Sequence, residues 1–381
     1  MDCIVIGCGL SGAVVARELA DRGKKVIILE RRSHIAGNLY DYQDEHGIWV
    51  HKYGPHIFHT SKKELYDYVC RYADWSDYRL VCGAEIDYKY SSTPFNFQTI
   101  DDFYPKQDAE ELKKRICQYF GSRSTATVIE VLESSDELIR AYGQFLFEKD
   151  YSLYTAKQWG ISPSEIDISI LKRVPLRFSY EEGYFEDTYE ALPTQGYTHF
   201  IENMLDHPNI SIKLESEALK ELDVDVAKQT VLFKQKPVSV PIVYTGALDE
   251  LFKCSKGGLP YRSLRFEWKY EDIDSKQNAP VVAYPQEEKY TRITEYKKLP
   301  VQNVKGTTYG VEYPIPYVPQ TGTEPYYPVL TKNSQEQYAL YHSMAEQIPN
   351  LYCCGRLADF KYYNMDQAIE EALKCSNRIK F

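Results

Sequence analysis

The chain has 381 residues, which at about 150 residues per domain predicts two or three domains. Hydrophobic residues make up 43% of it and charged residues 26%, enough for a large buried core in an ordinary globular protein. Acidic residues outnumber basic ones by 55 to 45, so the net charge is −10. Because affinity for nucleic acid needs a basic surface that displaces counterions, this balance excludes a general nucleic-acid-binding protein.

Tyrosine is the unusual component of the sequence, with 34 residues against 15 Phe and 4 Trp. A tyrosine ring offers a stacking face together with a hydroxyl group, which suits sites that bind sugars or bases. A compositional bias of the lineage is the alternative explanation for this surplus.

The N-terminus and the cysteines indicate the compartment. Met1 is followed almost at once by a strand-like run, Cys3–Ile6, which leaves no room for a signal peptide. No stretch approaches 18 apolar residues, so we expect no membrane span. The nine cysteines are scattered and form no C-x-x-C pair, a pattern typical of reduced thiols rather than of disulfides or a zinc site. We therefore expect a cytoplasmic protein without a metal.

The strongest local pattern lies in the first 30 residues. The apolar run Cys3–Ile6 predicts a buried strand, and it ends in the glycine-rich turn Gly7-Cys8-Gly9-Leu10-Ser11-Gly12. Helical apolar spacing follows over 13–20, and Lys25–Leu29 predicts a second buried strand ending at Glu30. A strand, a glycine turn, a helix and a strand in this order place a pyrophosphate at the helix N-terminus.

The three glycines and the acidic residue each have a physical reason in such a site. Gly7 permits the tight turn, Gly9 the close approach of backbone to ligand, and Gly12 the close packing of helix on strand. Glu30 lies where a carboxylate can accept hydrogen bonds from a ribose diol. The sequence therefore predicts a dinucleotide-binding unit.

The residues after Glu30 favour FAD over NAD. Arg31 and Arg32 could bind a 2′-phosphate, but the Glu30 carboxylate should repel one, which argues against NADP. The small residues that follow are similar to an extended FAD fingerprint, in which a second turn carries backbone close to the cofactor. That fingerprint usually ends in Gly-Gly, and here Ala36 precedes Gly37.

The rest of the chain predicts an interrupted nucleotide-binding domain. Helical patterns cover 62–74, 108–120 and 125–150, and the segments 172–195 and 262–330 read as strands and loops. Apolar runs at 210–214, 240–245 and 351–355 indicate a return of the chain to the first sheet, and a final helix is expected over 365–379. Asp366 lies at its N-terminus, where a carboxylate is stabilising.

Several longer motifs carry a resemblance to a known family. They are Gly7–Gly12 with Glu30, Val50–Thr60 (VHKYGPHIFHT), Pro94–Asn96, Tyr154–Gly160 (YTAKQWG), Arg173–Phe178, Tyr261–Leu264, Tyr290–Arg292, Tyr326–Pro328 and Gly355–Leu357. In order and approximate spacing the chain resembles the bacterial UDP-galactopyranose mutases over essentially its whole length.

The resemblance implies an α/β fold in three parts. A discontinuous Rossmann-like FAD-binding domain is expected over 1–80, 195–250 and 335–381. A helical domain is expected over 98–170, with a mobile loop to about 175, and an antiparallel β-sheet domain over 81–97, 171–194 and 251–334. Bacterial members of the family are commonly dimers, so a homodimer is expected.

The resemblance also implies an activity. The family interconverts UDP-galactopyranose and UDP-galactofuranose without net redox change: N5 of reduced FAD attacks the anomeric carbon and displaces UDP, and a flavin–sugar iminium then ring-opens and recloses. The substrate is thus a UDP-sugar, and an external reductant such as NADPH or a reduced flavin donor is required. Two alternatives stay open: a mutase of another nucleotide sugar (UDP-N-acetylgalactosamine or a dTDP-linked 6-deoxy sugar), and an FAD-dependent oxidoreductase of the amine-oxidase type.

Carried over by motif, the resemblance assigns roles to particular residues. Catalytic roles fall on His56, Arg173 and Arg292, the two arginines binding the diphosphate. Substrate contacts are implied for Asn96, Tyr154, Trp159, Arg173, Tyr184, Arg292, Tyr327, Tyr362 and Asn364. Cofactor contacts are implied for Gly7, Gly9, Ser11, Gly12, Glu30, Arg31, Gly37, Asn38, His56, Arg356, Tyr362 and Met365. Supporting charges are expected from Arg177 and Arg262, and parts of the pocket wall from Phe58 and His59.

One position departs from the family pattern. Where many members carry Tyr-x-Asp-Met-Asp, this chain reads Tyr362-Tyr363-Asn364-Met365-Asp366. Asn364 keeps a carbonyl acceptor but loses the carboxylate charge, so the identity of the sugar is less secure than that of the flavin.

Overall fold

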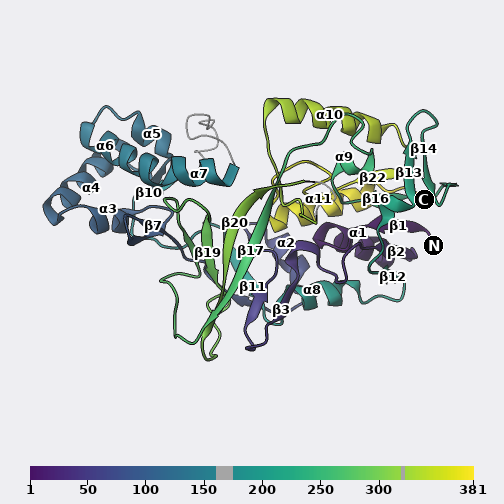
Figure 1. The fold of residues 1–381 in the computed structure, drawn as a ribbon, viewed down its shortest axis with the longest axis horizontal. Helices are drawn as coiled ribbons and strands as arrows, with labels where there is room; N and C mark the ends of the chain where they lie inside the picture. Colours follow the sequence, from purple (N-terminus) through teal and green to yellow (C-terminus); the bar gives the residue numbers. More distant parts are fainter. Residues whose placement is uncertain (160–174, 319–321) are drawn as a thin grey trace.

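A computed structural model describes residues 1–159, 175–318 and 322–381. The molecule is elongated, with a group of helices at one end, a large twisted sheet in the middle and an α/β unit with both termini at the other end (Figure 1). Over the described ranges, no helix combines the length and the apolar character that a membrane crossing requires.

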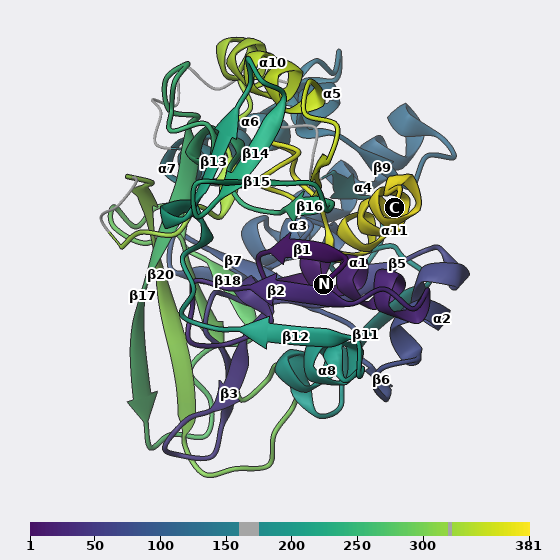
Figure 2. The ribbon, with the colours of Figure 1, turned by 90° about the vertical axis from the view of Figure 1, so that its right-hand side faces the viewer.

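A parallel sheet forms the centre of the α/β unit. Its strands, in spatial order, are β12 (Ile210–Lys213), β2 (Val26–Leu29), β1 (Cys3–Ile6), β16 (Ile242–Tyr244) and β22 (Leu351–Cys353). Each neighbouring pair runs in parallel, and β1, β2 and β12 lie side by side in Figure 2. The predicted return of the segments near 210, 240 and 351 to the first sheet is confirmed.

Helices cover one face of the parallel sheet. They are α1 (Leu10–Asp21), α8 (Gly196–Leu205) and α11 (Met365–Arg378). The apolar face of α1, with Val15 and Leu19 fully buried, packs against α8 and α11 in one core. The predicted helix 365–379 is confirmed, and the first helix ends before Gly23, whose φ of +79° suits glycine.

The other face carries a second core and a small antiparallel sheet. The elements there are η5 (Ala218–Lys220), β13 (Leu222–Asp225), β14 (Thr230–Phe233), β15 (Lys236–Val238), α9 (Leu248–Leu251) and α10 (Lys332–Glu346). Ile4 and Tyr244 of the parallel sheet are buried there against Leu248 and Tyr341. Strands apolar on both faces are expected where a parallel sheet is covered on both sides.

A larger sheet, the mixed sheet, forms the middle of the molecule. Its strands, in spatial order, are β21 (Tyr327–Pro328), β17 (Tyr261–Glu271), β20 (Thr307–Pro316), β19 (Arg292–Glu295), β18 (Val281–Ala283), β7 (Cys82–Ile86) and β8 (Lys89–Thr93). The long strands β17 and β20 pair from Arg262 opposite Pro316 to Glu271 opposite Thr307. The pairings are antiparallel apart from β18 with β7, which run in parallel.

The segment 171–194 pairs outside the mixed sheet. Strand β11 (Tyr189–Pro193) lies between β5 (Phe58–Thr60) and β6 (Trp75–Asp77), and β10 (Leu176–Arg177) pairs with β9 (Thr125–Ala126). We therefore propose a domain division in which 189–193 joins the α/β unit. The remaining short elements are η1 (Gly37–Leu39), β3 (Asp41–Gln43), β4 (Trp49–His51) and α2 (Lys63–Cys70), the last within the helix predicted over 62–74.

The helical end differs from the prediction in one place. The helix predicted over 108–120 is present as α4 (Lys106–Phe120), preceded by α3 (Phe97–Phe103). The helix predicted over 125–150 is divided into α5 (Val128–Leu132), α6 (Glu137–Leu146) and the π-helical turn η2 (Phe147–Tyr151), which continues into α7 (Ser152–Trp159). The division occurs because Asp136 starts a new helix, accepting hydrogen bonds from the backbone N–H groups of Leu138 and Ile139 at 2.9 and 3.3 Å.

Candidate active site

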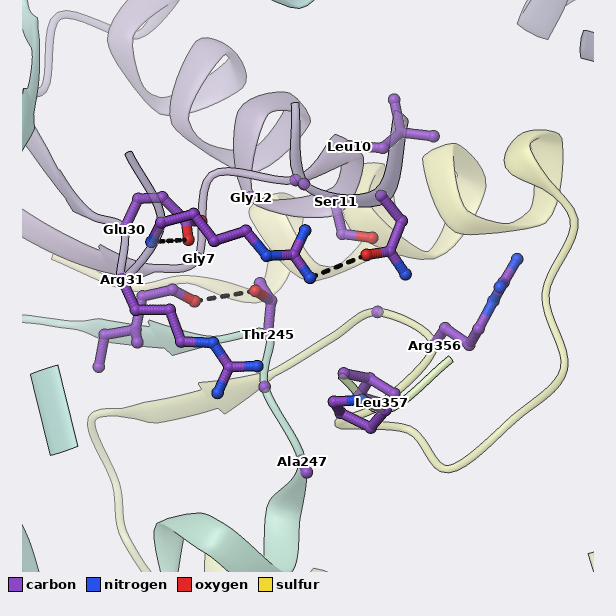
Figure 3. A pocket seen from close by; sticks show the side chains of 18 of the residues that line it. Gly7, Leu10, Ser11, Gly12, Glu30, Arg31, Thr245, Ala247, Arg356 and Leu357 are labelled. Atoms are coloured by element: carbon purple, nitrogen blue, oxygen red, sulfur yellow. Dashed lines mark hydrogen bonds between the residues drawn. The ribbon is translucent and has the colours of Figure 1, made fainter. Parts of the chain in front are cut away.

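A first cavity, the glycine-lined cavity, lies where β1 runs into α1. Gly7 has a φ of +103°, and a Cβ atom on Gly12 would lie 2.1 Å from the Gly7 carbonyl oxygen. The first turn of α1 contains no acidic residue, so its backbone N–H groups are available to an anion. Figure 3 shows Gly7, Ser11 and Gly12 on one side of this cavity and Ala247 and Leu357 on the other.

A second glycine turn packs against the first. A Cβ atom on Gly37 would lie 2.8 Å from the Cα atom of Gly9, and Gly37 has a φ of +56°. Ala36 adopts the left-handed conformation as well, with a φ of +70°. The two turns therefore meet backbone to backbone, as the extended fingerprint predicts, and Ala36 takes the conformation in which Gly is more usual.

Glu30 links two backbone segments beside this cavity by hydrogen bonds. Its side chain is buried, and its two oxygens accept hydrogen bonds from the N–H groups of Cys8 and Arg32 at 2.7 and 2.8 Å. The guanidinium groups of Arg31 and Arg32 both pair with Glu324, at 2.7 and 2.9 Å. Their charge is thus compensated within the chain, which agrees with the prediction that they do not form a site for a 2′-phosphate.

A second cavity, the aromatic cavity, adjoins the first. The two cavities share four residues, His56, Arg356, Asn364 and Met365. From this junction the aromatic cavity extends between β7, β18 and β19 of the mixed sheet and the helices η2 and α7. Its walls include the side chains of Phe95, Tyr151, Tyr154, Tyr184, Phe185, Tyr327 and Tyr362.

His56 at the junction is neutral. Burial, together with the neighbouring His51 and Arg356, lowers its pKa to about 3. Its Nδ1 lies 2.8 Å from the Gly54 carbonyl oxygen, which can only accept, so the proton belongs on Nδ1 and Nε2 keeps its lone pair. The backbone N–H of His56 donates to Nδ1 of His51 at 3.1 Å, which fixes this loop.

Arg292 brings positive charge into the aromatic cavity. Its Nε lies 2.8 Å from a carboxylate oxygen of the buried Glu312 on the neighbouring strand β20. Although burial opposes the charge, Glu312 raises the pKa of Arg292 above its ordinary value. A smaller side cavity between Arg262, Arg292 and Glu312 opens beside this pair.

Stacked tyrosines line the cavity beside Arg356. The rings of Tyr327 and Tyr362 are 4.7 Å apart and nearly parallel, with an interplanar angle of 11°. The Arg356 guanidinium lies 4.8 Å from the Tyr327 ring centre, a cation–π distance, and donates to the Tyr363 carbonyl oxygen at 2.7 Å. This arrangement fixes one wall at the junction of the two cavities.

Comparisons with known proteins identify the family. Residues 149–362 match the model of the UDP-galactopyranose mutase family, and residues 5–72 match that of an NAD(P)-binding Rossmann-like domain. A UDP-galactopyranose mutase of Mycoplasma pneumoniae is 35% identical over 98% of this chain and 94% of its own length. The chain belongs to the UDP-galactopyranose mutase family.

Two further comparisons bear on the substrate and on the fold. A dTDP-fucopyranose mutase of Escherichia coli is 34% identical over 98% of this chain and 97% of its own. A crystal structure of a reduced UDP-galactopyranose mutase has the same fold, with a TM-score of 0.71 over 99% of this chain and 94% of that one at 15% identity. The α/β fold class and the Rossmann-like domain are confirmed, and this mutase-family chain is an enzyme of the isomerase class.

The glycine-lined cavity fits the flavin cofactor of the mutase family. It offers a helix N-terminus for the pyrophosphate, backbone cradles that a Cβ atom would fill, and Glu30 for a ribose. The predicted cofactor residues that line it are Gly7, Gly9, Ser11, Gly12, Glu30, Arg31, Gly37, Asn38, His56, Arg356 and Met365. Tyr362 lines the aromatic cavity instead.

Most predicted substrate residues meet in the aromatic cavity. Those that line it are Tyr154, Tyr184, Arg292, Tyr327, Tyr362 and Asn364. Arg173, the side chain of Trp159 and the loop predicted to be mobile, up to residue 174, lie outside the described residues. His59 also lines the cavity, while Arg262 lines the side cavity and Phe58 is part of the core.

Asn96 and Arg177 have structural partners instead. Asn96 starts helix α3: its side chain accepts from the Gln98 N–H at 2.8 Å and donates to the Glu181 carbonyl oxygen at 3.0 Å. It is not among the residues that line the two cavities, and its contact with the substrate stays a prediction. Arg177 is buried and donates to the carbonyl oxygen of Gly183.

The prediction missed several residues on the helical side of the cavity, apart from Tyr154, and one beside Arg292. The missed residues that line the aromatic cavity from the helical side are Asp150, Tyr151, Thr155 and Gln158. Glu312, which pairs with Arg292, was missed as well. The only available signal was that Thr155 and Gln158 fall inside the motif around Tyr154; nothing in the sequence distinguishes Asp150 or Glu312 from surface acids.

Proposed function

We propose that this enzyme interconverts UDP-galactopyranose and UDP-galactofuranose, with reduced FAD in the glycine-lined cavity and the nucleotide sugar in the aromatic cavity. The observation that carries the proposal is the junction of the two cavities at His56, Arg356, Asn364 and Met365. A sugar held at that junction adjoins the cofactor site, while its nucleotide extends past Arg292.

The flavin, when bound and reduced, supplies a nucleophilic N5 for the anomeric carbon of the sugar. The chain supplies binding and orientation. Arg292 presents a guanidinium fork that suits phosphate oxygens, and Glu312 on one edge leaves its terminal nitrogens for the ligand. Arg173 and Trp159 stay proposed as further contacts to the diphosphate and the nucleoside.

His56 positions a proton acceptor at the reacting end. With Nδ1–H donated to Gly54, its Nε2 offers a lone pair to a hydroxyl or N–H group at the junction. Because the pKa is lowered to about 3, this acceptor persists across the physiological pH range. We propose that His56 orients the sugar and the reacting edge of the cofactor rather than carrying a charge.

A second substrate is kept as a candidate because of one relative and one residue. The dTDP-fucopyranose mutase is about as similar to this chain as the UDP-galactopyranose mutase is, at 34% against 35% identity. Asn364 lies at the junction, in the place of the more usual carboxylate. A dTDP-linked 6-deoxy sugar or UDP-N-acetylgalactosamine is therefore the alternative substrate.

The test is turnover of UDP-galactofuranose by the FAD-loaded enzyme, followed by chromatography of the nucleotide sugars. We expect conversion to the pyranose after reduction with dithionite and no conversion by the oxidised enzyme. Failure of the reduced enzyme to form the pyranose would overturn the UDP-galactose assignment, and parallel incubation with a dTDP-linked 6-deoxyfuranose tests the alternative.

Three further expectations accompany the proposal. We propose an external reductant such as NADPH or a reduced flavin donor, a homodimer as the working state, and a cytoplasmic location. Stopped-flow bleaching of the flavin absorbance by NADPH tests the first expectation. Light scattering behind a sizing column tests the second, and fractionation of the cells that make the protein tests the third.

A further inference from the structure

Asp150 is a buried carboxylate in the aromatic cavity to which the proposed reaction assigns no role. It belongs to the π-helical turn η2, its side chain lines the cavity, and only 9% of the residue is exposed. Within the described part of the chain, no side chain or backbone group donates a hydrogen bond to it. A buried polar group is normally paired, and an unpaired carboxylate facing a cavity points to a ligand that supplies the missing donor.

The nearest cation does not satisfy this carboxylate. The Lys157 ammonium on α7 donates to the carbonyl oxygens of Tyr284 and Tyr290 at 2.6 and 2.7 Å, and also to those of Pro285 and Glu287. Lys157 therefore influences Asp150 only through its positive charge, which acts to lower the pKa of the carboxyl group. Burial raises the pKa of Asp150 to about 7 against this charge, so a large fraction of the group is ionised at neutral pH and its lone pairs are available.

Arg292 lies near both the junction and the tyrosines of the cavity. Burial is the largest cause of the lowered pKa of His56 and of the raised pKa of Tyr154, and the Arg292 charge acts on both groups. Arg292 lies on β19 of the mixed sheet, whereas Tyr154 lies on α7 of the helical end, and both line the aromatic cavity.

Asp150 lies at the helical end of the molecule. It belongs to η2, between α6 and α7, and lines the aromatic cavity together with the neighbouring Tyr151. Figure 1 shows α6 and α7, which flank η2, well separated from α1 and α11 at the glycine-lined cavity. When a nucleotide sugar has its sugar at the junction and its phosphates at Arg292, the group that reaches Asp150 is the nucleoside base.

The walls at this end suit a flat aromatic ring. Phe95 and Tyr151 meet edge to face at 5.7 Å, and Tyr184 and Phe185 do so at 5.0 Å, all four lining the cavity. Aromatic walls bind any base by stacking and do not distinguish one from another. An ionised carboxylate only accepts hydrogen bonds, so at the ring position that faces it a base with an N–H group is favoured over a base with a lone pair.

We propose that the Asp150 carboxylate accepts a hydrogen bond from N3–H of a uracil or thymine base and so makes the cavity prefer these two pyrimidines to cytosine, whose N3 carries a lone pair. The inference rests on the proposed function, in which a nucleotide sugar occupies the aromatic cavity. Cytosine lacks a hydrogen at N3, and a methyl group on N3 of uracil removes the same donor.

The test measures nucleotide affinity of the FAD-loaded full chain by calorimetry. The probes are UDP, N3-methyl-UDP, 2′-deoxy-UDP and CDP, each with the wild type, Asp150→Ala and Asp150→Asn. Hydrogen bonds to charged groups correspond to about tenfold to hundredfold in affinity, so the wild type should bind UDP that much more tightly than N3-methyl-UDP. Asp150→Ala should bind the two within about threefold, whereas Asp150→Asn, which keeps an oxygen acceptor, should retain a preference for UDP.

Glu148→Ala is the matched control, because Glu148 is an exposed acid in the same turn η2. It makes the same change of charge and should leave the preference for UDP intact. Retained flavin absorbance shows that each variant is folded. An unchanged preference for UDP in folded Asp150→Ala would overturn the proposal, and Asp150→Asn, which is closest in shape to the wild type, serves where Asp150→Ala fails to fold.

The outcomes separate this proposal from the proposed function. Equal binding of UDP and N3-methyl-UDP by the wild type overturns the role of Asp150 and leaves the function standing. Discrimination against 2′-deoxy-UDP alone overturns it too, because the carboxylate would then read the ribose. If the FAD-loaded chain binds none of the nucleotides, the proposed function fails with it.

Discussion

The glycine-lined cavity and the aromatic cavity meet at His56, but they are built from different material. The first is formed mainly by backbone of two adjoining turns, where Gly12 and Gly37 leave no space for a side chain. The second is formed by side chains from separate segments, with an ion pair of the half-buried Arg292 and the buried Glu312, and with Asp150, which accepts no hydrogen bond from the described ranges. Because backbone atoms of the first cavity are already in contact, an added side-chain atom must displace the backbone. In the second cavity, a substitution can remove one side-chain interaction and leave the others in place.

The largest expected effect comes from adding one carbon atom to the backbone site. In Gly12→Ala the new Cβ would lie 2.1 Å from the Gly7 carbonyl oxygen, so the helix must move away from the turn that holds the pyrophosphate. We expect loss of FAD from the purified protein, measured by flavin absorbance. Gly23→Ala is the control: its φ of +79° costs about 1 to 2 kcal/mol, but nothing lies within 4 Å, so FAD should stay bound.

The next prediction concerns the ion pair of Arg292 with Glu312 in the aromatic cavity. Glu312→Ala leaves the half-buried Arg292 guanidinium without its partner, which costs about 3 kcal/mol of unfolding free energy, the low end for a buried charge. Urea unfolding measures this cost. At low temperature, where the variant remains folded, FAD should still bind while UDP binding weakens; equal loss of both ligands would show that the two cavities are not independent.

Acid should destabilise the loop that joins the two cavities. Burial lowers the pKa of His51, which is 3% exposed, to about 4, so the unfolded chain takes up a proton first as the pH falls below 6.5. Stability is then lost between pH 6.5 and 4 at about 1.4 kcal/mol per pH unit, up to about 3 kcal/mol from this one group. His51→Gln should flatten that part of the stability profile, and an unchanged slope would contradict the assignment.

The buried acid of the aromatic cavity should have an effect of the opposite sign. The pKa of Asp150 is raised to about 7 in the folded protein, from 3.8, so the folded state holds its proton longer and stability falls as pH rises from 4 to 7. Asp150→Asn should therefore stabilise the nucleotide-free enzyme by up to about 4 kcal/mol at pH 8 and hardly at all at pH 4. Urea unfolding at both pH values tests this; an equal effect at both would mean that the charge is not the cause.

The same contrast explains what the sequence could predict. The glycine-lined cavity is local in sequence, because Gly7, Gly9, Gly12 and Glu30 lie within one strand–helix–strand unit whose geometry is set by the backbone. The resemblance of longer motifs to the family then located several residues of the aromatic cavity, including Tyr154 and Arg292.

The remaining site residues depend on contacts that spacing does not encode. Glu312 and Arg292 are 20 positions apart and meet because β19 and β20 pair, and Asp150 faces the cavity because the chain forms a π-helical turn there. Asn96 has a structural role that the sequence could have indicated. Its side chain caps helix α3, and Thr99 three positions later completes a recognisable capping pattern.

The central claim is that the two cavities form one site, and the flavin spectrum tests it most directly. The oxidised FAD-loaded enzyme is titrated with UDP-galactose while calorimetry reports binding. We predict a shift of the flavin absorbance bands that saturates with the calorimetric curve and diminishes in His56→Ala, because the sugar then lies beside the flavin at the junction. Saturated binding with an unchanged flavin spectrum would contradict the claim.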